Sequence, residues 1–368
     1  MTGSTLRILV VGAGTAGLAV ARALRLAGYR PDVTEQSPAD RATEGGIYLP
    51  GNAARALRDI GLGDPVRPLG QVVARQCFLD GSGQPLCEVD LTALWRGVGE
   101  CRVLPRADLH RVLLTGAGGA VRHCTDVSGI EPGTDSVGVT FDNGDRAEYD
   151  LVVGADGARS AVRGLAAIGG AARPAGQLVY QAVVKGGPKI TEWTCLLGDR
   201  ASFVVAPMGA GLLYCHADET GTVPPADPLA RLREVFGGYG DPVPAVLDAM
   251  DQVQVSVAAE VELGRWSRGR VVLVGDAAHA TAPTLAQGVA MAIEDAVVLA
   301  DALRRADDVV AALAGYESRR RPRTRWVRDR TRDRDRTRDV TPALRDPLLR
   351  DRGGRIFQGH YRLLVDPA

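Results

Sequence analysis

The stretch Leu6-Arg-Ile-Leu-Val-Val-Gly-Ala-Gly-Thr-Ala-Gly-Leu-Ala-Val-Ala-Arg-Ala-Leu24 decides the fold of this chain. It turns an apolar strand into a helix through three glycines spaced G-x-G-x-x-G. Gly12 permits a tight turn, Gly14 lets the backbone approach a pyrophosphate, and Gly17 lets the helix pack close to the strand. The helix N-terminus offers free N–H groups and a partial positive charge, which both suit a diphosphate.

A second apolar strand, Pro31-Asp-Val-Thr-Glu35, ends on an acid 18 residues after Gly17. Dinucleotide-binding folds place there the carboxylate that accepts hydrogen bonds from the ribose hydroxyls. A glycine fingerprint alone is weak evidence, and the alternative is a tight glycine turn in another α/β protein. Strand, spacing and acid together favour a dinucleotide-binding domain.

Composition narrows the possible function classes. The 368 residues suffice for two domains, or for one large domain with an inserted lobe. Lys plus Arg and Asp plus Glu are 44 each, and this balance argues against a nucleic-acid partner. No apolar run is long enough for a membrane span, so we expect neither a transmembrane segment nor a secretory signal. The six cysteines lack zinc-site and dithiol spacing, so we expect reduced thiols, no metal and a cytoplasmic protein.

The rest of the chain predicts an α/β fold with an inserted β-sheet. Residues 151–153 form an apolar run typical of a buried parallel strand, and residues 70–90 alternate like a hairpin. Strands dominate residues 176–261. We therefore expect a Rossmann-like dinucleotide-binding domain made of residues 1–70, 101–175 and 262–325, an inserted sheet domain made of residues 71–100 and 176–261, and a helical C-terminal extension over residues 326–368.

The C-terminal region is unusually rich in charge. Residues 286–304 show helical spacing of apolar side chains. Residues 319–339 then hold eleven arginines and four aspartates. They are either a nucleic-acid arm or a solvated helix whose charges pair, such as Asp329 with Arg332 and Asp335 with Arg338. The interleaved charges favour the solvated helix.

Three segments together carry a resemblance to a known family. They are the Gly12–Gly17 turn, Val153-Gly-Ala-Asp-Gly-Ala-Arg-Ser-Ala-Val-Arg163, and Gly275-Asp-Ala-Ala-His279 with its continuation through Pro283 to Ala296. Through them the chain resembles the single-component, FAD-dependent aromatic hydroxylases of the para-hydroxybenzoate hydroxylase class, especially salicylate- and urate-hydroxylase-like members. The resemblance implies a monooxygenase that uses FAD, NADPH or NADH, and O₂. Its substrate would be an aromatic or polyketide-like small molecule, hydroxylated through a C4a-hydroperoxyflavin.

The resemblance also assigns roles to single residues. Asp276 follows a strand, where a carboxylate can accept hydrogen bonds from ribitol hydroxyls. The N–H groups that open the following helix suit the flavin pyrimidine ring and the negative charge that builds there on reduction. The cofactor-binding residues expected are Gly12, Gly14, Ala16, Gly17, Glu35, Arg41, Gly46, Arg106, Val127, Asp156, Gly275, Asp276, Gly288, Val289 and Ala290.

No second dinucleotide fingerprint occurs, so Arg159 and Arg163 become candidates for binding NAD(P)H. We expect His279 to be structural, and Glu294 and Asp295 to pair or to be solvated rather than to react. No catalytic residue is assigned, because the cofactor carries the oxygen chemistry. The candidate pocket residues are Tyr48, Phe203, Met208, Tyr214 and Pro283.

Two other functions stay open at this point. A flavin-dependent epoxidase, oxidase or dehydrogenase could use the same scaffold, and so could a flavin-binding protein without turnover. The substrate is not identified either. The strand block contains few basic side chains, so it shows no clamp for a substrate carboxylate.

Overall fold

The computed structural model describes residues 6–39 and 44–368. The glycine fingerprint begins a five-stranded sheet, in which four strands are parallel and the edge strand β17 is antiparallel. Strand β1, which lies between two parallel neighbours, is buried at every position. In spatial order the strands are β17 (Ser267–Arg268), β18 (Val271–Leu273), β11 (Leu151–Gly154), β1 (Ile8–Val11) and β2 (Asp32–Thr34).

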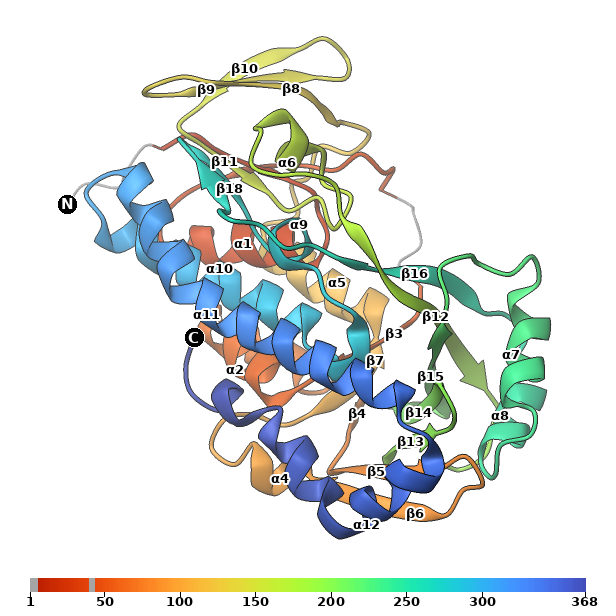
Figure 1. Cartoon of the computed structure of the whole chain (residues 1–368). Helices are drawn as coiled ribbons and strands as arrows, with labels where there is room; N and C mark the ends of the chain where they lie inside the picture. The colour runs from red at the N-terminus through yellow and green to blue at the C-terminus, as the bar shows by residue number, and fades with distance from the viewer. Residues whose placement is uncertain (1–5, 40–43) are drawn as a thin grey trace.

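A long helix, α10 (Gly288–Arg305), organises the helical layer beside this sheet. It packs against α1 (Thr15–Leu26), α2 (Gly51–Asp59) and α11 (Val309–Arg336), and Figure 1 shows α10 and α11 running side by side. The helix expected at residues 286–304 is thereby confirmed, with its start at Gly288. On the other side of α1 lies α5 (Arg106–Gly116), which also contacts it.

The inserted block forms a seven-stranded sheet. The hairpin expected at residues 70–90 is confirmed, and it joins this sheet through the parallel β13–β5 pair. Helices α7 (Pro228–Phe236) and α8 (Val243–Asp248) pack on one face of the sheet (Figure 1). The strand order is β16 (Gln254–Glu260), β12 (Arg173–Lys185), β15 (Leu212–Thr220), β14 (Ala201–Gly209), β13 (Trp193–Leu197), β5 (Arg75–Asp80) and β6 (Pro85–Asp90).

Two small antiparallel sheets complete the strands. One has the order β3 (Gly46–Leu49), β7 (Arg102–Pro105) and β4 (Gln71–Val72), and it brings the start of β3 beside Arg106. The other has the order β10 (Arg146–Tyr149), β9 (Val137–Phe141) and β8 (Val127–Pro132). The remaining short helices are α3 (Gly63–Val66), α4 (Leu91–Leu94), α6 (Ala161–Leu165), α9 (Asp276–His279), η1 (Pro283–Leu285), η2 (Thr337–Asp339) and η3 (Arg362–Leu364).

The arginine-rich segment is helical, but it is not simply solvated. Arg320 of α11 is fully buried and Arg323 nearly so, because α11 packs along α10 and meets its acidic side chains. The expected pair between Asp335 and Arg338 is present at 3.5 Å. The expected pair between Asp329 and Arg332 is wrong, since Arg332 reaches two glutamates in and after β16, and Asp329 pairs with Arg328. The last long helix, α12 (Pro342–Gly359), packs on β6.

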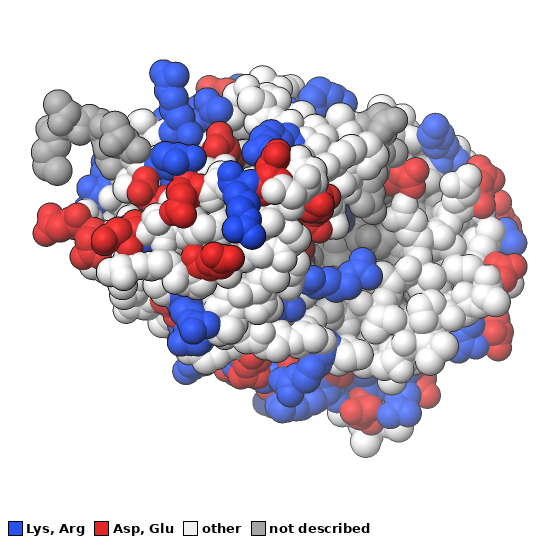
Figure 2. Space-filling model, turned by 90° about the horizontal axis from the view of Figure 1, so that it is seen from above, with Lys and Arg blue, Asp and Glu red and all other residues white. Residues whose placement is uncertain are grey.

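Surface chemistry is mixed. On the face seen in Figure 2, basic and acidic side chains are interspersed.

No helix in the described part of the chain is both long and apolar enough to cross a bilayer. All six cysteines are free thiols, as expected. Among residues 6–39 and 44–368, no cluster of three or more His, Cys, Asp or Glu side chains is arranged to hold a metal ion.

Candidate active site

A cavity of about 720 Å³ lies where the nucleotide-binding lobe, the seven-stranded sheet and the C-terminal helices meet. This volume is typical of a site for a small molecule or cofactor. One wall comes from the five-stranded lobe and includes Gly14, Thr15, Ala16, Gly46, Ile47, Tyr48, Arg106, Gly157, Asp276, Pro283, Gly288 and Val289. The facing wall comes from the large sheet and includes Gln181, Trp193, Cys195, Ser202, Val204, Tyr214, His216 and Asp218.

The glycine turn has the geometry that a dinucleotide requires. Gly12 has a φ of +102°, and a Cβ there would lie 2.6 Å from the carbonyl oxygen of Ala155. A Cβ on Gly17 would lie 1.8 Å from the carbonyl oxygen of Gly12, so only glycine allows this close helix packing. At Gly14, by contrast, a Cβ would meet no described atom within 4 Å. The backbone is therefore open to a ligand at Gly14 and tightly packed at the other two glycines.

Glu35 lies against this turn. Its carboxylate accepts hydrogen bonds from the N–H groups of Ala13 and Ser37, each 2.9 Å long. Burial alone would raise the pKa of Glu35, but these hydrogen bonds outweigh it and lower the pKa, so the group is ionised. The N–H of Thr125 donates to the Glu35 carbonyl, which brings the start of β8 beside the acid. Val127 itself is buried, and its N–H donates to Asp126.

Two charged side chains face the cavity from the nucleotide-binding lobe. Asp276 is the first residue of α9, after Gly275 with a φ of +58°, and Arg106 is the first residue of α5. Neither side chain makes a hydrogen bond within the described part of the chain, although both line the cavity. The pKa of Asp276 is raised, because the effect of burial outweighs the opposing effect of the nearby His279 and Arg106. Such unsatisfied charges fit a ligand that carries hydroxyls and phosphates, as FAD does.

The N-terminus of α10 forms the next part of this wall. Gly288 and Val289 line the cavity, and Ala290 is buried behind them. The first N–H groups of a helix have no intrahelical partner and carry a partial positive charge. Pro283 of η1 also lines the cavity. Gly46, on β3, approaches Tyr214 so closely that a Cβ there would lie 2.4 Å from the tyrosine ring.

A buried charge network fixes the turn that carries Asp276. Asp295 of α10 accepts hydrogen bonds from the Gly275 N–H at 2.8 Å and from Arg320 Nε at 2.7 Å, and it contacts His279 Nε2 at 2.7 Å. Burial would raise the pKa of Asp295, but His279 and Arg320 reverse this and lower it to about 2. Glu294 pairs with Arg320 at 2.8 Å. The two acids pair, as expected, and His279 braces the turn.

The second motif is held by its own side chains. Asp156 accepts a hydrogen bond from the Val162 N–H at 3.0 Å. Arg163 is buried, and its guanidinium donates to three backbone carbonyls: Ala158 at 2.8 Å, Gly170 at 2.7 Å and Ala277 at 2.9 Å. Arg163 therefore braces this loop against α9, and these three carbonyls already use its donors, so we expect no contact of Arg163 with NAD(P)H.

The other NAD(P)H candidate has a different setting. Arg159 is exposed, and its role toward the electron donor stays a prediction. Arg41, expected beside the cofactor, lies outside the described residues.

Three of the five candidate pocket residues line the cavity, and two do not. Tyr48, Tyr214 and Pro283 line it. Phe203 instead packs in the core between the sheet and its helices, with its ring centre 5.3 Å from that of Phe236 of α7. Side chains alternate along β14, and its two neighbours, Ser202 and Val204, line the cavity while Phe203 does not. Met208 is buried in the main core. The expectation for Phe203 and Met208 is therefore corrected.

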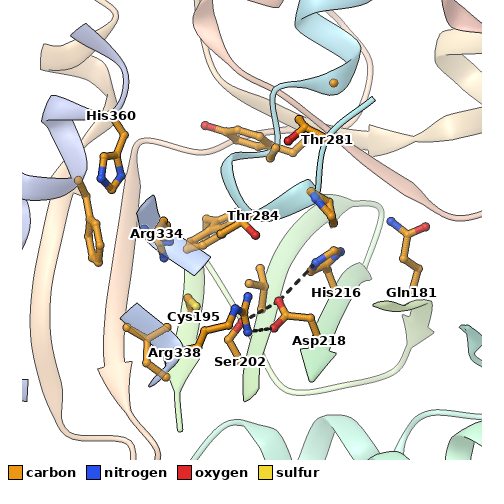
Figure 3. Close-up of a pocket in the computed structure, with 18 of the residues that line it drawn as sticks. Gln181, Cys195, Ser202, His216, Asp218, Thr281, Thr284, Arg334, Arg338 and His360 are labelled. Atoms are coloured by element: carbon orange, nitrogen blue, oxygen red, sulfur yellow. Dashed lines mark hydrogen bonds and ion pairs between the residues drawn. The ribbon is translucent and has the colours of Figure 1, made fainter. Parts of the chain in front are cut away.

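Sequence reasoning missed a polar cluster on the sheet wall, which Figure 3 shows. Asp218 accepts hydrogen bonds from Ser202 Oγ at 2.8 Å and from Arg338, and it lies 3.8 Å from His216 Nε2. Burial would raise the pKa of Asp218, but Arg338 outweighs it and lowers the pKa. Burial lowers the pKa of His216, which is therefore neutral at physiological pH. The alternation Tyr214-x-His216-x-Asp218 was the available signal, since it puts three polar side chains on one strand face.

Tyr214 completes this wall. Its hydroxyl accepts a hydrogen bond from Gln181 at 2.8 Å, and burial raises its pKa to about 12. The phenol therefore stays protonated and can donate to a molecule in the cavity.

Comparisons with known proteins agree with this geometry. The protein family described as "FAD binding domain" matches residues 5–331. The chain is 33% identical to 3-amino-4-hydroxybenzoate 2-monooxygenase PtmB3 of Streptomyces platensis, over 89% of this chain and 87% of that protein. It is 31% identical to the FAD-dependent urate hydroxylase of Klebsiella pneumoniae, over 96% of this chain and 97% of that protein.

A solved structure gives the same result. The crystal structure of Klebsiella pneumoniae HpxO complexed with FAD and uric acid superposes with a TM-score of 0.85 at 28% identity, over 98% of this chain and 95% of that chain. Fingerprint, fold, cavity and identity agree on one family. This chain therefore belongs to the FAD-binding class A monooxygenases, and it is a flavin-dependent monooxygenase with FAD as its cofactor.

Proposed function

We propose that this monooxygenase uses NAD(P)H and O₂ to hydroxylate a small aromatic molecule held between the nucleotide-binding lobe and the seven-stranded sheet. One observation carries the proposal. A single cavity has unpartnered Asp276 and Arg106 on its cofactor wall and Tyr214 and His216 on the facing wall. The relatives named above are a 3-amino-4-hydroxybenzoate monooxygenase and a urate hydroxylase, which supports a ring compound as substrate.

The residues of the cofactor wall fit FAD by their chemistry. Asp276 would accept hydrogen bonds from cofactor hydroxyls, Arg106 would pair with a phosphate, and Gly14 leaves the space that a pyrophosphate needs. The N-terminus of α10 at Gly288 would stabilise negative charge near the flavin pyrimidine. When bound, FAD supplies the hydride acceptance, oxygen activation and oxygen transfer of the reaction.

The sheet wall would orient the substrate. Neutral His216 can accept a hydrogen bond or a proton from a phenolic hydroxyl, which makes the ring more electron-rich and easier to oxygenate. Asp218, held by Arg338 and Ser202, lies 3.8 Å from His216 Nε2 on the same strand. Tyr214 would donate to a polar substituent of the ring. Apolar neighbours on both walls exclude water from the reacting face.

Purified FAD-loaded enzyme tests the proposal against a panel of phenols, aminophenols, quinolones and polyketide-like aromatics. NADPH and NADH oxidation, hydrogen peroxide release and product masses would be followed together. We expect at least one aromatic to accelerate NAD(P)H oxidation and to leave as a phenol, with little peroxide. An epoxide product, an oxidised product without added oxygen, peroxide alone with every compound, or no turnover at all would each contradict the proposal.

A further inference from the structure

The arginines that line the cavity differ in whether an acidic side chain pairs with them. Five arginines and three aspartates line the cavity, which gives its wall a positive excess. Three of the arginines have acidic partners: Arg200 with Asp339, Arg338 with Asp218 and Arg345 with Asp346. The guanidinium groups of the other two, Arg106 and Arg334, make no hydrogen bond or ion pair within the described part of the chain. Arg106 belongs to the cofactor wall, where a phosphate would pair with it, so Arg334 is the cation without an assigned partner.

Stacking holds Arg334 at the cavity. It lies in the last turn of α11, and its guanidinium carbon is 4.2 Å from the ring centre of Phe357 and 5.1 Å from that of Phe78. Two aromatic rings fix the plane of the guanidinium but leave its N–H donors unused. A half-buried cation of this kind gains most from a planar anion such as a carboxylate, which binds guanidinium through paired, charge-assisted hydrogen bonds.

A second unsatisfied group lies beside it. His360 follows α12, and its Nδ1 is buried without a hydrogen-bond partner in the described part of the chain. Burial and the charge of Arg334 lower the pKa of His360 to about 4, so the ring is neutral and Nδ1 can donate or accept one hydrogen bond. Figure 3 shows His360 and Arg334 on the same side of the cavity, near Cys195.

The walls around these groups are apolar. Leu349, Ile356 and Phe357 of α12 line this lobe of the cavity. Leu344 and Leu348 also line it, although they are 73% and 49% exposed, so they form an apolar edge that is open to solvent. An occupant of this lobe therefore needs an apolar body as well as an anionic group.

We infer that Arg334 is a specificity-determining residue, which binds a carboxylate borne by the aromatic substrate at the end remote from the reacting ring. The inference rests on the proposed function, because it assumes an aromatic molecule in this cavity. His360 supplies a second, neutral contact, and the apolar side chains of α12 cover the body of the substrate. This segment lies outside the strand block, which is why that block by itself shows no carboxylate clamp.

Matched ligand pairs test the inference by binding rather than by turnover. Titration calorimetry on the FAD-loaded enzyme would compare benzoate with benzamide, 2-naphthoate with 2-naphthamide, and biphenyl-4-carboxylate with its amide. We expect at least one carboxylate to bind about tenfold or more tightly than its amide, as one charge-assisted pair predicts. Arg334→Gln should remove that preference, and Arg334→Lys should keep part of it, since lysine retains the charge but not the paired donors.

Arg330→Gln is the matched control. Arg330 lies one turn earlier in α11, stacks on Trp326 at 5.1 Å and does not line the cavity. The control should keep the carboxylate preference and the FAD content. A wild-type enzyme with no preference for any carboxylate would overturn the inference even if Arg334→Gln failed to fold. So would an Arg334→Gln enzyme that keeps the preference, or one whose only defect is a raised KM for NADPH.

Failure of the inference and failure of the proposed function look different. If neutral aromatics are hydroxylated while carboxylates and amides bind equally well, only the role of Arg334 is overturned. If no aromatic compound drives oxygen insertion, the proposed function itself fails and the inference falls with it.

Discussion

Replacing Asp295 by asparagine should destabilise the enzyme by about 2–5 kcal/mol. Asp295 is fully buried and accepts hydrogen bonds from Arg320 and the Gly275 N–H, next to His279. Burial would raise its pKa, but the charges of His279 and Arg320 outweigh it and lower the pKa from 3.8 to about 2. Each pKa unit corresponds to about 1.4 kcal/mol, so the ionised carboxylate contributes roughly 2–3 kcal/mol near pH 7. Leaving Arg320 with one acid instead of two accounts for the upper part of the range.

The direction of the pH dependence follows from the lowered pKa. A group whose pKa is lower in the folded state stabilises the fold above its unfolded pKa and stops doing so as the pH falls through its folded pKa. For Asp295 this window runs from 3.8 down to about 2. The difference in stability between wild type and Asp295→Asn should therefore be constant at neutral pH and should shrink across that window.

Urea unfolding followed by circular dichroism at pH 7 measures the effect, and Asp301→Asn is its control. The pKa of Asp301 is also lowered to about 2, but its partners Arg304, Arg305 and Arg319 are largely exposed. Ion pairs of that kind contribute less than about 1 kcal/mol. If Asp295→Asn lowers the free energy of unfolding no more than Asp301→Asn does, the buried network does not brace the Gly275 turn and this reasoning is refuted.

Other predictions concern the cofactor and the electron donor. Asp276→Ala should weaken FAD binding about tenfold or more, because an acceptor for cofactor hydroxyls is lost; a fluorescence titration that matches wild type would contradict this. Gly17→Ala should prevent folding, since its Cβ would lie 1.8 Å from a carbonyl oxygen, whereas Gly14→Ala should fold normally and bind FAD less well. If the two glycine variants had equal effects on thermal unfolding, the predicted difference between Gly17 and Gly14 would be wrong. Arg163→Met should lower the melting temperature and leave the KM for NADPH unchanged after FAD reconstitution, while Arg159→Ala should raise that KM with normal stability.

The nucleotide-binding part of the fold was predictable because the residues that define it lie within one short stretch of sequence. Gly12 and Gly17 are fixed by contacts with each other and with the neighbouring strand end. Glu35 is placed by a strand only a few residues long. The sequence spacing therefore carries nearly all the information that these positions need.

The C-terminal region was harder to predict because its charge partners are distant in sequence. Nothing near Arg320 or Arg323 indicates that both are buried against Glu294, since the pairing depends on how α11 packs along α10. The alternating charges of residues 319–339 therefore looked like a solvated face. Arg334 and Arg338 reach the cavity because the end of α11 and the following η2 lie against the seven-stranded sheet, where Arg338 pairs with Asp218 of β15.

The sheet wall was predictable in part. Successive side chains of a strand point to opposite faces of the sheet, so a shift of one residue decides which of them face the cavity. The aromatic character of a residue does not show to which face it points. Phe203 was therefore assigned to the wrong face, while Tyr214 was assigned correctly. Polar residues at alternate positions of β15 are the better guide, because Tyr214, His216 and Asp218 all line the cavity.

Oxygen isotope labelling tests the central claim most directly. The FAD-loaded enzyme would turn over its best aromatic substrate with NAD(P)H under ¹⁸O₂, and the product would be analysed by mass spectrometry. We predict a hydroxylated aromatic product that carries one ¹⁸O atom for each molecule converted, and no label when ¹⁸O is supplied only as water. A product that takes its oxygen from water, or NAD(P)H oxidation that yields only labelled hydrogen peroxide, would contradict the account.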